Sequence, residues 1–320
     1  MTKTLAIALN TFKEAVRNRV LYVLLFFSVL ILFGAWLAST LSIERPERIV
    51  RDLGVAAINI ISGLIAVFVG IGLVYNDLDK KTIYTVVSKP ISRWQFLVGK
   101  YIGLLGTILV NVLIMTWVFC TVLHLRDAFT DEATNQAIYR QLESGAYEYK
   151  GALAHLGYVA TSIIGAVLKG AANILSLGFY STPITEGLFL ASVLTMLEMM
   201  VIVSFAVLFS SFSTPTLSAF LTAFVWVIGK GNQELYLLAQ SLMKKAGGTT
   251  ETMDASQELI YHFAKFSAHI APNLELFNQR PQIADFAPVV VSPMALAYGI
   301  VYSAGIIAIS VLIFERRNFK

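Results

Sequence analysis

One carboxylate, Glu198, stands in the middle of a long apolar stretch, in the run TMLEMM. A charged side chain in such surroundings is costly, so it must face other protein groups or water, and it is a candidate for chemistry. We expect Glu198 to face the interior of a helix bundle or a dimer interface, either as a structural hydrogen-bonding residue or in substrate binding or coupling. Asn59 and Asn111, in two other apolar stretches, are expected to join helices.

The patterns that carry out enzymatic chemistry are missing from the sequence. A phosphate-binding loop needs Gly-x-x-x-x-Gly-Lys followed by Ser or Thr, whereas Lys100 is followed by Tyr101 and Lys230 by Gly231. One cysteine and four dispersed histidines make neither a disulfide framework nor a metal-binding cluster. No motif pairs a nucleophile with a base. We therefore expect no enzymatic activity, and no cofactor or metal bound by this chain.

The apolar stretches that hold these residues define the fold class. Of the 320 residues, 57% are hydrophobic and only 14% are charged, against about a quarter charged in soluble domains. The runs approach the ~20 residues that cross a hydrocarbon core, and in lipid such runs must be helical. We predict an all-α polytopic membrane protein, one transmembrane domain over 1–320, with spans near 20–41, 53–75, 97–123, 187–210, 215–230 and 288–314.

The N-terminal segment, residues 1–19, has a different pattern. Leu5, Leu9, Phe12 and Val16 recur at helical spacing while charged residues fall on other faces. This pattern is typical of an amphipathic helix that lies in the membrane interface. The segment carries four cations and no early apolar run, so we expect no cleaved signal sequence.

The distribution of Lys and Arg predicts the orientation. Residues 1–19, 76–100 and 315–320 together carry twelve cations and four anions. Because cytoplasmic segments are enriched in Lys and Arg, both termini are expected in the cytoplasm. Residues 125–186 and 231–287 then lie outside.

Two parts of these outer regions have helical patterns of their own. The segment 151–178 is apolar enough for a seventh span, but Lys169 near its centre would cost ~3 kcal/mol in lipid. An odd number of spans would also place the C-terminal cations Arg316 and Arg317 outside the cytoplasm. We therefore place the segment at the outer surface. A second amphipathic helix has Leu259, Phe263, Phe266 and Ile270 on one face.

The cytoplasmic segment 76–96 has a defined internal order. A half-apolar helix is predicted over 82–87, and Lys89-Pro90 ends it because the residue before proline avoids the helical region. Ser92 can cap a further helix that starts near Arg93. This order suits a rigid element that carries force from a soluble partner into the spans. An ordinary basic loop remains the alternative.

The order of residues in this segment resembles that of ABC-2 type permeases, especially those of the bacterial branch related to multidrug export, copper processing and gliding. The likeness extends to Pro272–Asn278 (PNLELFN) and to FERRNF at 314–319. The family typically has glutamate at the position of Asp77 and often glycine at that of Lys81. The matching residues of the segment are Asp77, Thr82, Pro90, Ser92, Arg93, Phe96, Gly99 and Lys100.

The resemblance implies an elbow helix plus six transmembrane helices in a type V exporter-like permease fold. It implies that 76–96 is a coupling helix on a separate ATPase, that two ATPases bind ATP and Mg, and that two permease chains pair as a homo- or heterodimer. It further implies a bacterial or archaeal cytoplasmic (inner) membrane, contact with membrane lipid, outer helices that partly re-enter the membrane, and no nucleic acid. The implied ATPase contacts are Asp77, Lys80, Lys81, Thr82, Pro90, Ser92 and Arg93.

Other function classes stay open. An ion-gradient-driven secondary transporter would use Glu198, but such transporters usually have several intramembrane charges and repeated broken helices. Transport that survives collapse of the gradient while ATP persists would exclude it. A membrane-embedded enzyme lacks its motifs, and a purely structural scaffold is compatible with the sequence.

Overall fold

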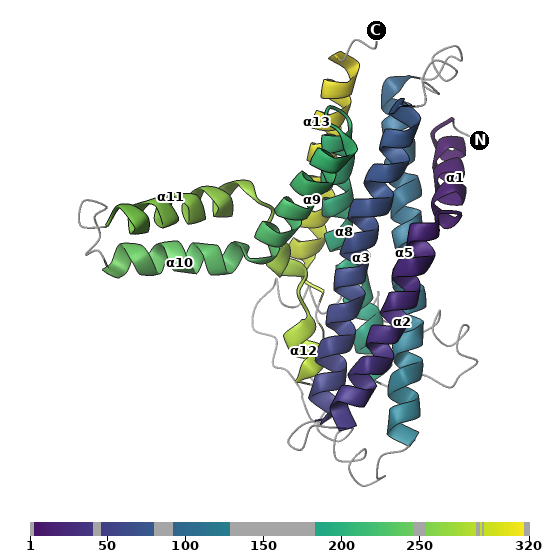
Figure 1. Cartoon of the computed structure of the whole chain (residues 1–320), viewed down its shortest axis with the longest axis vertical. Helices are drawn as coiled ribbons and strands as arrows, with labels where there is room; N and C mark the ends of the chain where they lie inside the picture. The colour runs from purple at the N-terminus through teal and green to yellow at the C-terminus, as the bar shows by residue number, and fades with distance from the viewer. Residues whose placement is uncertain are drawn as a thin grey trace.

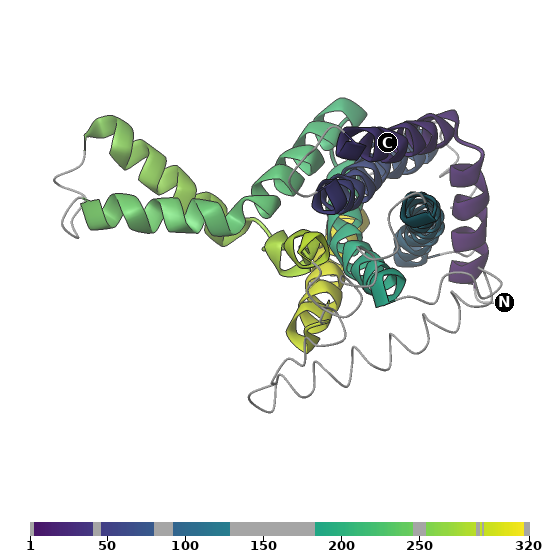
Figure 2. The same cartoon turned by 90° about the horizontal axis from the view of Figure 1, so that it is seen from below.

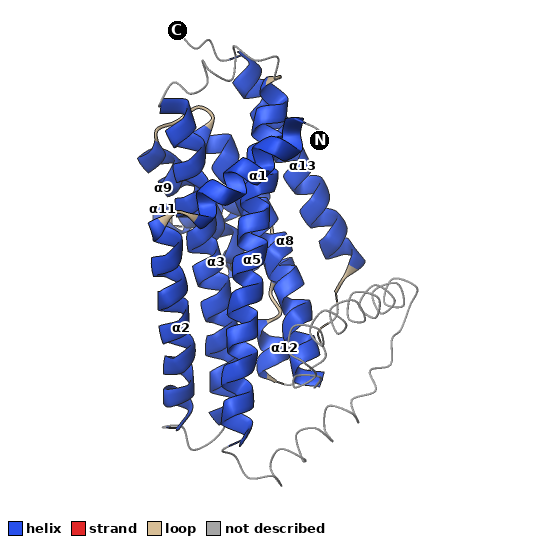
Figure 3. Ribbon diagram, turned by 90° about the vertical axis from the view of Figure 1, so that its right-hand side faces the viewer, coloured by secondary structure: helices blue, strands red, loops and turns tan. Residues whose placement is uncertain are grey.

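The structure is a computed structural model that describes residues 3–40, 46–79, 92–128, 183–245, 254–285, 289 and 291–316. All regular elements in these residues are helices (Figure 3). Five of the described helices are long and apolar enough to cross a membrane. The predicted all-α membrane architecture is confirmed. The five helices are α2 (Arg19–Thr40), α3 (Pro46–Asp79), α5 (Arg93–Ala128), α8 (Pro183–Ser210) and α13 (Pro293–Arg316).

The long helices run side by side along the long axis of the molecule, and both chain ends lie at the same end of the bundle (Figure 1). Helix α8 packs against α3, α5 and α13 and is the most buried of the five. It is apolar around its whole circumference, as expected of a helix in the core. Its three serine hydroxyls donate to carbonyl oxygens within the helix; Ser204, for example, donates to the carbonyl oxygen of Val201.

The N-terminal helix α1 (Lys3–Val16) lies crosswise to the bundle, as seen along the long axis in Figure 2. Its small residues Ala8 and Thr11 are buried against α5. A Cβ atom at Gly103 of α5 would lie 2.5 Å from the carbonyl oxygen of Ala8, so glycine permits this close approach. Leu5 and Leu9 of the predicted apolar stripe remain exposed, as in a helix whose other face meets lipid.

The fifth predicted span forms α9 (Pro215–Lys230), with the predicted bounds. Its 16 residues extend about 24 Å, less than the ~30 Å of a hydrocarbon core. The described residues therefore give five long apolar helices and one short one, and the count of six full spans stays a prediction. Helix α9 ends at Lys230, whose ammonium group reaches back into the bundle.

After α9 the chain forms a helical hairpin, α10 (Asn232–Lys245) and α11 (Ala255–Ile270), that projects sideways from the bundle (Figure 1). A small core of Ala239, Tyr261 and Ala264 holds its two helices together. Leu259 and Phe266 of the predicted amphipathic piece are exposed. The chain then returns through the 3₁₀ helix η2 (Leu274–Phe277) and the short α12 (Arg280–Ala284), which packs on α3.

Several predictions fall outside the described residues. The segment 151–178 is one of them, as is most of 76–96, including Lys80, Lys81, Thr82 and Pro90. Asp77 lies in the last turn of α3, and its side chain is not described. Helix α5 begins at Arg93, as predicted, and the backbone N–H of Ser92 donates to the side chain of Gln95 at 3.3 Å. This bond is half of a capping box.

Candidate functional site

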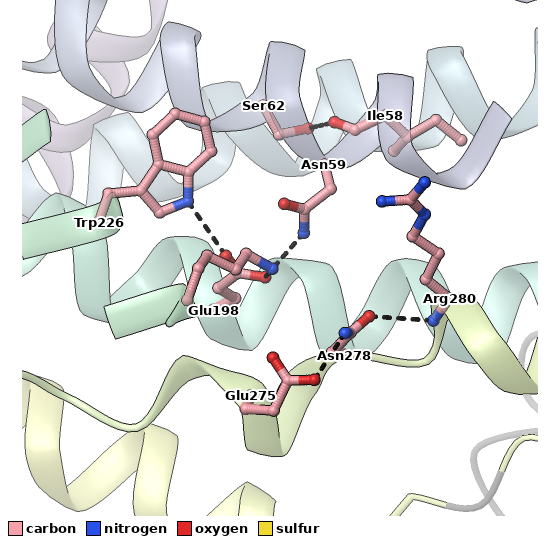
Figure 4. Close-up of polar contacts among 9 residues, drawn as sticks. Ile58, Asn59, Ser62, Glu198, Trp226, Glu275, Asn278 and Arg280 are labelled. Carbon is pink, nitrogen blue, oxygen red and sulfur yellow. Dashed lines mark hydrogen bonds and ion pairs between the residues drawn. The ribbon is translucent and has the colours of Figure 1, made fainter. Parts of the chain in front are cut away.

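Glu198 of α8 is fully buried and accepts hydrogen bonds from three side chains on two neighbouring helices. From α3, the Asn59 Nδ2 donates to its Oε2 at 2.7 Å. From α9, the Trp226 Nε1 donates to its Oε1 at 3.2 Å, and the Lys230 Nζ donates to its Oε2 at 2.8 Å. Figure 4 shows the carboxylate between Asn59 and Trp226. The cluster ties α3, α8 and α9 together through one acidic side chain.

The Glu198–Lys230 contact is an ion pair between a buried and a partly exposed group. The Glu198 side chain is 0% exposed and that of Lys230 is 29% exposed. Removal of one partner from a buried pair leaves an uncompensated charge, which commonly costs about 3–5 kcal/mol. Lys230 therefore allows a carboxylate to occupy the centre of an apolar bundle.

Gly63 of α3 places the Trp226 indole in this cluster. A Cβ atom at Gly63 would overlap the six-membered ring of Trp226. With glycine there, the indole lies directly against the α3 backbone and its N–H points to Glu198. A small residue at this position is thus a requirement of the cluster.

A cavity of about 300 Å³ adjoins the cluster. Four segments line it, and both apolar and polar side chains face it. Lys230 and Arg280 supply its two cationic side chains, and no acidic residue is among the described lining residues. The lining comes from residues within 55–60 of α3, Ala191 and Thr195 of α8, Trp226, Val227 and Lys230 of α9, and 277–280.

Two ion pairs fix the wall of the cavity that α12 provides. Arg280 bonds Asp52 of α3 twice, at 2.5 Å from Nε to Oδ1 and 2.7 Å from Nη2 to Oδ2. Arg48 bonds Asp285 at 3.1 Å from Nε to Oδ1. The hydrogen bonds to Asp52 raise the pKa of Arg280 above its already high value, so this cation stays charged. Bidentate pairs of this kind add geometric specificity to charge.

The PNLELFN stretch shapes the turn that leads to Arg280. The Asn278 Nδ2 donates to Glu275 at 2.8 Å, and the Asn278 Oδ1 accepts from the backbone N–H of Arg280 at 3.1 Å (Figure 4). The Tyr298 hydroxyl accepts from the backbone N–H of Asn273 at 2.9 Å. These contacts orient the start of α12 and so the guanidinium of Arg280.

Among the predicted ATPase contacts, Ser92 and Arg93 lie elsewhere, at the start of α5. The Arg93 Nη1 donates to the carbonyl oxygen of Glu315 at 3.0 Å, at the C-terminal end of α13. The rings of Phe96 and Phe314 stack there, with centroids 6.3 Å apart. Arg93 thus contacts the end of α13, while Glu198 lies within the bundle and is not brought to it. Whether they contact an ATPase stays a prediction.

The sequence prediction for the buried polar residues was partly right. Asn59 does join two helices through Glu198. Asn111 does not join helices by the bond described, because its Nδ2 donates to the carbonyl oxygen of Thr107 in the same helix. Lys230 was missed as the partner of Glu198. The signal in the sequence was a lysine at the end of an apolar helix that is too short to cross a membrane.

Arg280 and the cavity were also missed. The cavity is lined by segments more than 200 residues apart in the chain, such as Val55 of α3 and Arg280 of α12. The periodicity of apolar and polar residues predicts individual helices but not which helices pack together, so it does not predict such a site.

Comparison with known protein families identifies the class to which this bundle belongs. Five apolar helices of membrane-spanning length define an integral membrane protein. A sequence model of the ABC-2 family transporter proteins matches residues 5–319. The chain therefore belongs to the ABC-2 family of transport permeases. Among curated proteins, no relative matches it.

Proposed function

We propose that the chain is the membrane-spanning subunit of an ATP-driven exporter, in which a separate ATPase supplies the energy. Family membership over 5–319 carries this proposal. A permease without a phosphate-binding loop of its own must receive its energy from a partner or from an ion gradient, and the family match favours a partner. The proposed place is a bacterial or archaeal cytoplasmic membrane, with both termini inside.

The packing around the predicted coupling segment 76–96 supports transmission of force. The segment connects α3 to α5, and the start of α5 is bonded to the end of α13 through Arg93. Helix α1 packs on α5 close by, and the Nζ of the buried Lys100 lies 3.6 Å from Glu14 of α1. A displacement of this segment would thus reach four helices directly. A flexible loop would dissipate it.

We further propose that two such chains pair, as a homo- or heterodimer, above two ATPase subunits. The proposed ATPase contacts are Asp77, Lys80, Lys81, Thr82, Pro90, Ser92 and Arg93. Nucleotide and Mg²⁺ would bind the ATPase and not this chain. Arg93 also bonds the end of α13, so its substitution would disturb the packing of the chain itself. Substitutions of Lys80 and Lys81 are therefore the clearer test of ATPase binding.

Co-purification tests the proposal. The tagged chain is isolated from native membranes in mild detergent, and co-purifying chains are identified by mass spectrometry. We expect a soluble protein with a phosphate-binding loop, lost in the Lys80→Glu/Lys81→Glu variant. The matched control is Lys244→Glu/Lys245→Glu, which reverses two exposed charges on the hairpin. Absence of any ATPase, even after cross-linking, would contradict the proposal.

The alternative, a gradient-driven transporter, depends on Glu198 as an ion carrier. The structure gives Glu198 three hydrogen-bond donors, one of them the Lys230 ammonium. A carrier must release its ion in each cycle, so these bonds would have to break each time. Their number therefore favours a fixed structural role for Glu198.

A further inference from the structure

We propose that the cavity beside Glu198 binds an oxyanion, a phosphate or carboxylate, carried by an amphipathic molecule. The cations Lys230 and Arg280 come from two different elements, α9 and α12, and both line this one space. Their carboxylate partners, Glu198 and Asp52, are not among the lining residues. The cation of each ion pair therefore borders the cavity, while its carboxylate partner does not.

Both cations have hydrogen-bond donors beyond those used by their partners. An ammonium group has three donors and a guanidinium five. Among the described residues, Lys230 donates to Glu198, while Arg280 uses Nε and Nη2 for Asp52. The remaining donors suit an acceptor with several oxygens, because charge-assisted bonds to oxyanions are the strong ones.

The carboxylates behind these cations hold them in position. A bidentate bond fixes the plane of the Arg280 guanidinium, and Glu198 fixes the ammonium of Lys230 from the buried side. A buried ion pair adds little to stability compared with well-packed apolar side chains. Stability alone thus gives no reason for a Lys–Glu pair here, whereas preorganised cations for a ligand give one.

The rest of the lining selects an amphipathic ligand. Ile60, Val227 and Phe277 line the same space, together with the neutral polar residues Asn59, Thr195 and Asn278. The volume of about 300 Å³ lies at the low end of small-ligand cavities, which are commonly ~300–1,000 Å³. It accommodates a head group and the adjoining carbons.

Such an oxyanion has two sources, a membrane lipid or a soluble molecule. The test uses purified full-length protein and three probes: phosphatidylglycerol, the zwitterionic phosphatidylcholine, and glycerol phosphate. Native mass spectrometry counts bound lipid, and competition with glycerol phosphate measures the soluble anion. No ATPase is needed, so failure here would leave the proposed function untouched.

The structure offers a closely matched pair of variants. Arg280→Gln/Asp52→Asn removes the ion pair that lines the cavity, whereas Arg48→Gln/Asp285→Asn removes a neighbouring pair outside the cavity. Both pairs join α3 to α12 or to the residue that follows it, and both double substitutions leave the net charge unchanged. We expect the first to weaken binding of the anionic probe about tenfold or more, and the control to change it less than twofold.

A third variant guards against a general loss of structure. Ala56→Leu places extra carbon atoms in the cavity and alters no charge; we expect it to abolish binding as well. Saturable binding of phosphatidylglycerol that glycerol phosphate does not displace would identify a lipid head group as the ligand. Displacement of the lipid by an equal concentration of glycerol phosphate would identify a soluble ligand. Equal binding of both lipids, or equal loss in the two ion-pair variants, would overturn the proposal.

Discussion

At the scale of single residues, one ion pair holds the buried cluster together. Loss of the Lys230 ammonium leaves the Glu198 carboxylate buried with two neutral donors. We expect Lys230→Met to lower the free energy of unfolding by on the order of 3 kcal/mol. The double variant Glu198→Gln/Lys230→Met should regain most of that loss, since no charge stays buried. Thermal unfolding in one detergent measures both, and a double variant less stable than Lys230→Met would contradict this role.

The close approach of Trp226 to Gly63 predicts a second residue-scale effect. Gly63→Ala puts a methyl group where the indole lies, so we expect a loss of about 1–3 kcal/mol from overpacking. The control is Gly72→Ala in the same helix, where a Cβ atom meets nothing within 4 Å. Equal unfolding temperatures for the two variants would show that the indole does not pack as described.

At the scale of elements, the contact of α1 with α5 is the clearest target. A side chain at Gly103 would press on the Ala8 carbonyl and on Thr11. We expect Gly103→Leu to detach α1 and to speed tryptic cleavage at the exposed Lys13. Gly106→Ala is the control, because its Cβ atom would make ordinary contact with Phe12 at 3.6 Å. Unchanged cleavage in Gly103→Leu would refute this packing.

The elements also show how far the sequence could be interpreted alone. Helices α2 and α9 were predicted to within about one residue, because their apolar runs end at polar residues or proline. Helix α10 was not predicted, since it is stabilised by α11 and not by a strong pattern of its own. Helix α3 begins seven residues before the predicted span, at Pro46, because its first turns are charged and pair with α12.

The candidate site was harder to predict from the sequence than the helices were. Glu198 stood out because a carboxylate in an apolar run is rare. Its partners Asn59 and Lys230 lie 139 and 32 residues away in the chain, and pairing over such separations requires the fold. The function class was predictable only through the order of motifs, which resembles that of ABC-2 permeases. The family match over 5–319 confirms this resemblance.

At the scale of the whole molecule, the arrangement predicts which segments share a side of the membrane. Both chain ends lie at one end of the bundle (Figure 1). In a Cys120→Ser background, we expect Lys13→Cys to react with an impermeant maleimide only after the membrane is opened. Lys245→Cys, on the hairpin, should react in intact cells. The opposite pattern would reverse the proposed orientation.

The most direct test of an ATP-driven permease is photo-cross-linking from position 82 in native membranes. A photoreactive amino acid replaces Thr82, and the same amino acid replaces the exposed Leu237 on the hairpin as a control. We predict that position 82 captures a protein with a phosphate-binding loop and that position 237 does not. Capture of no ATPase from 82, in cells that express the full transport system, would contradict the assignment as an ATP-driven permease.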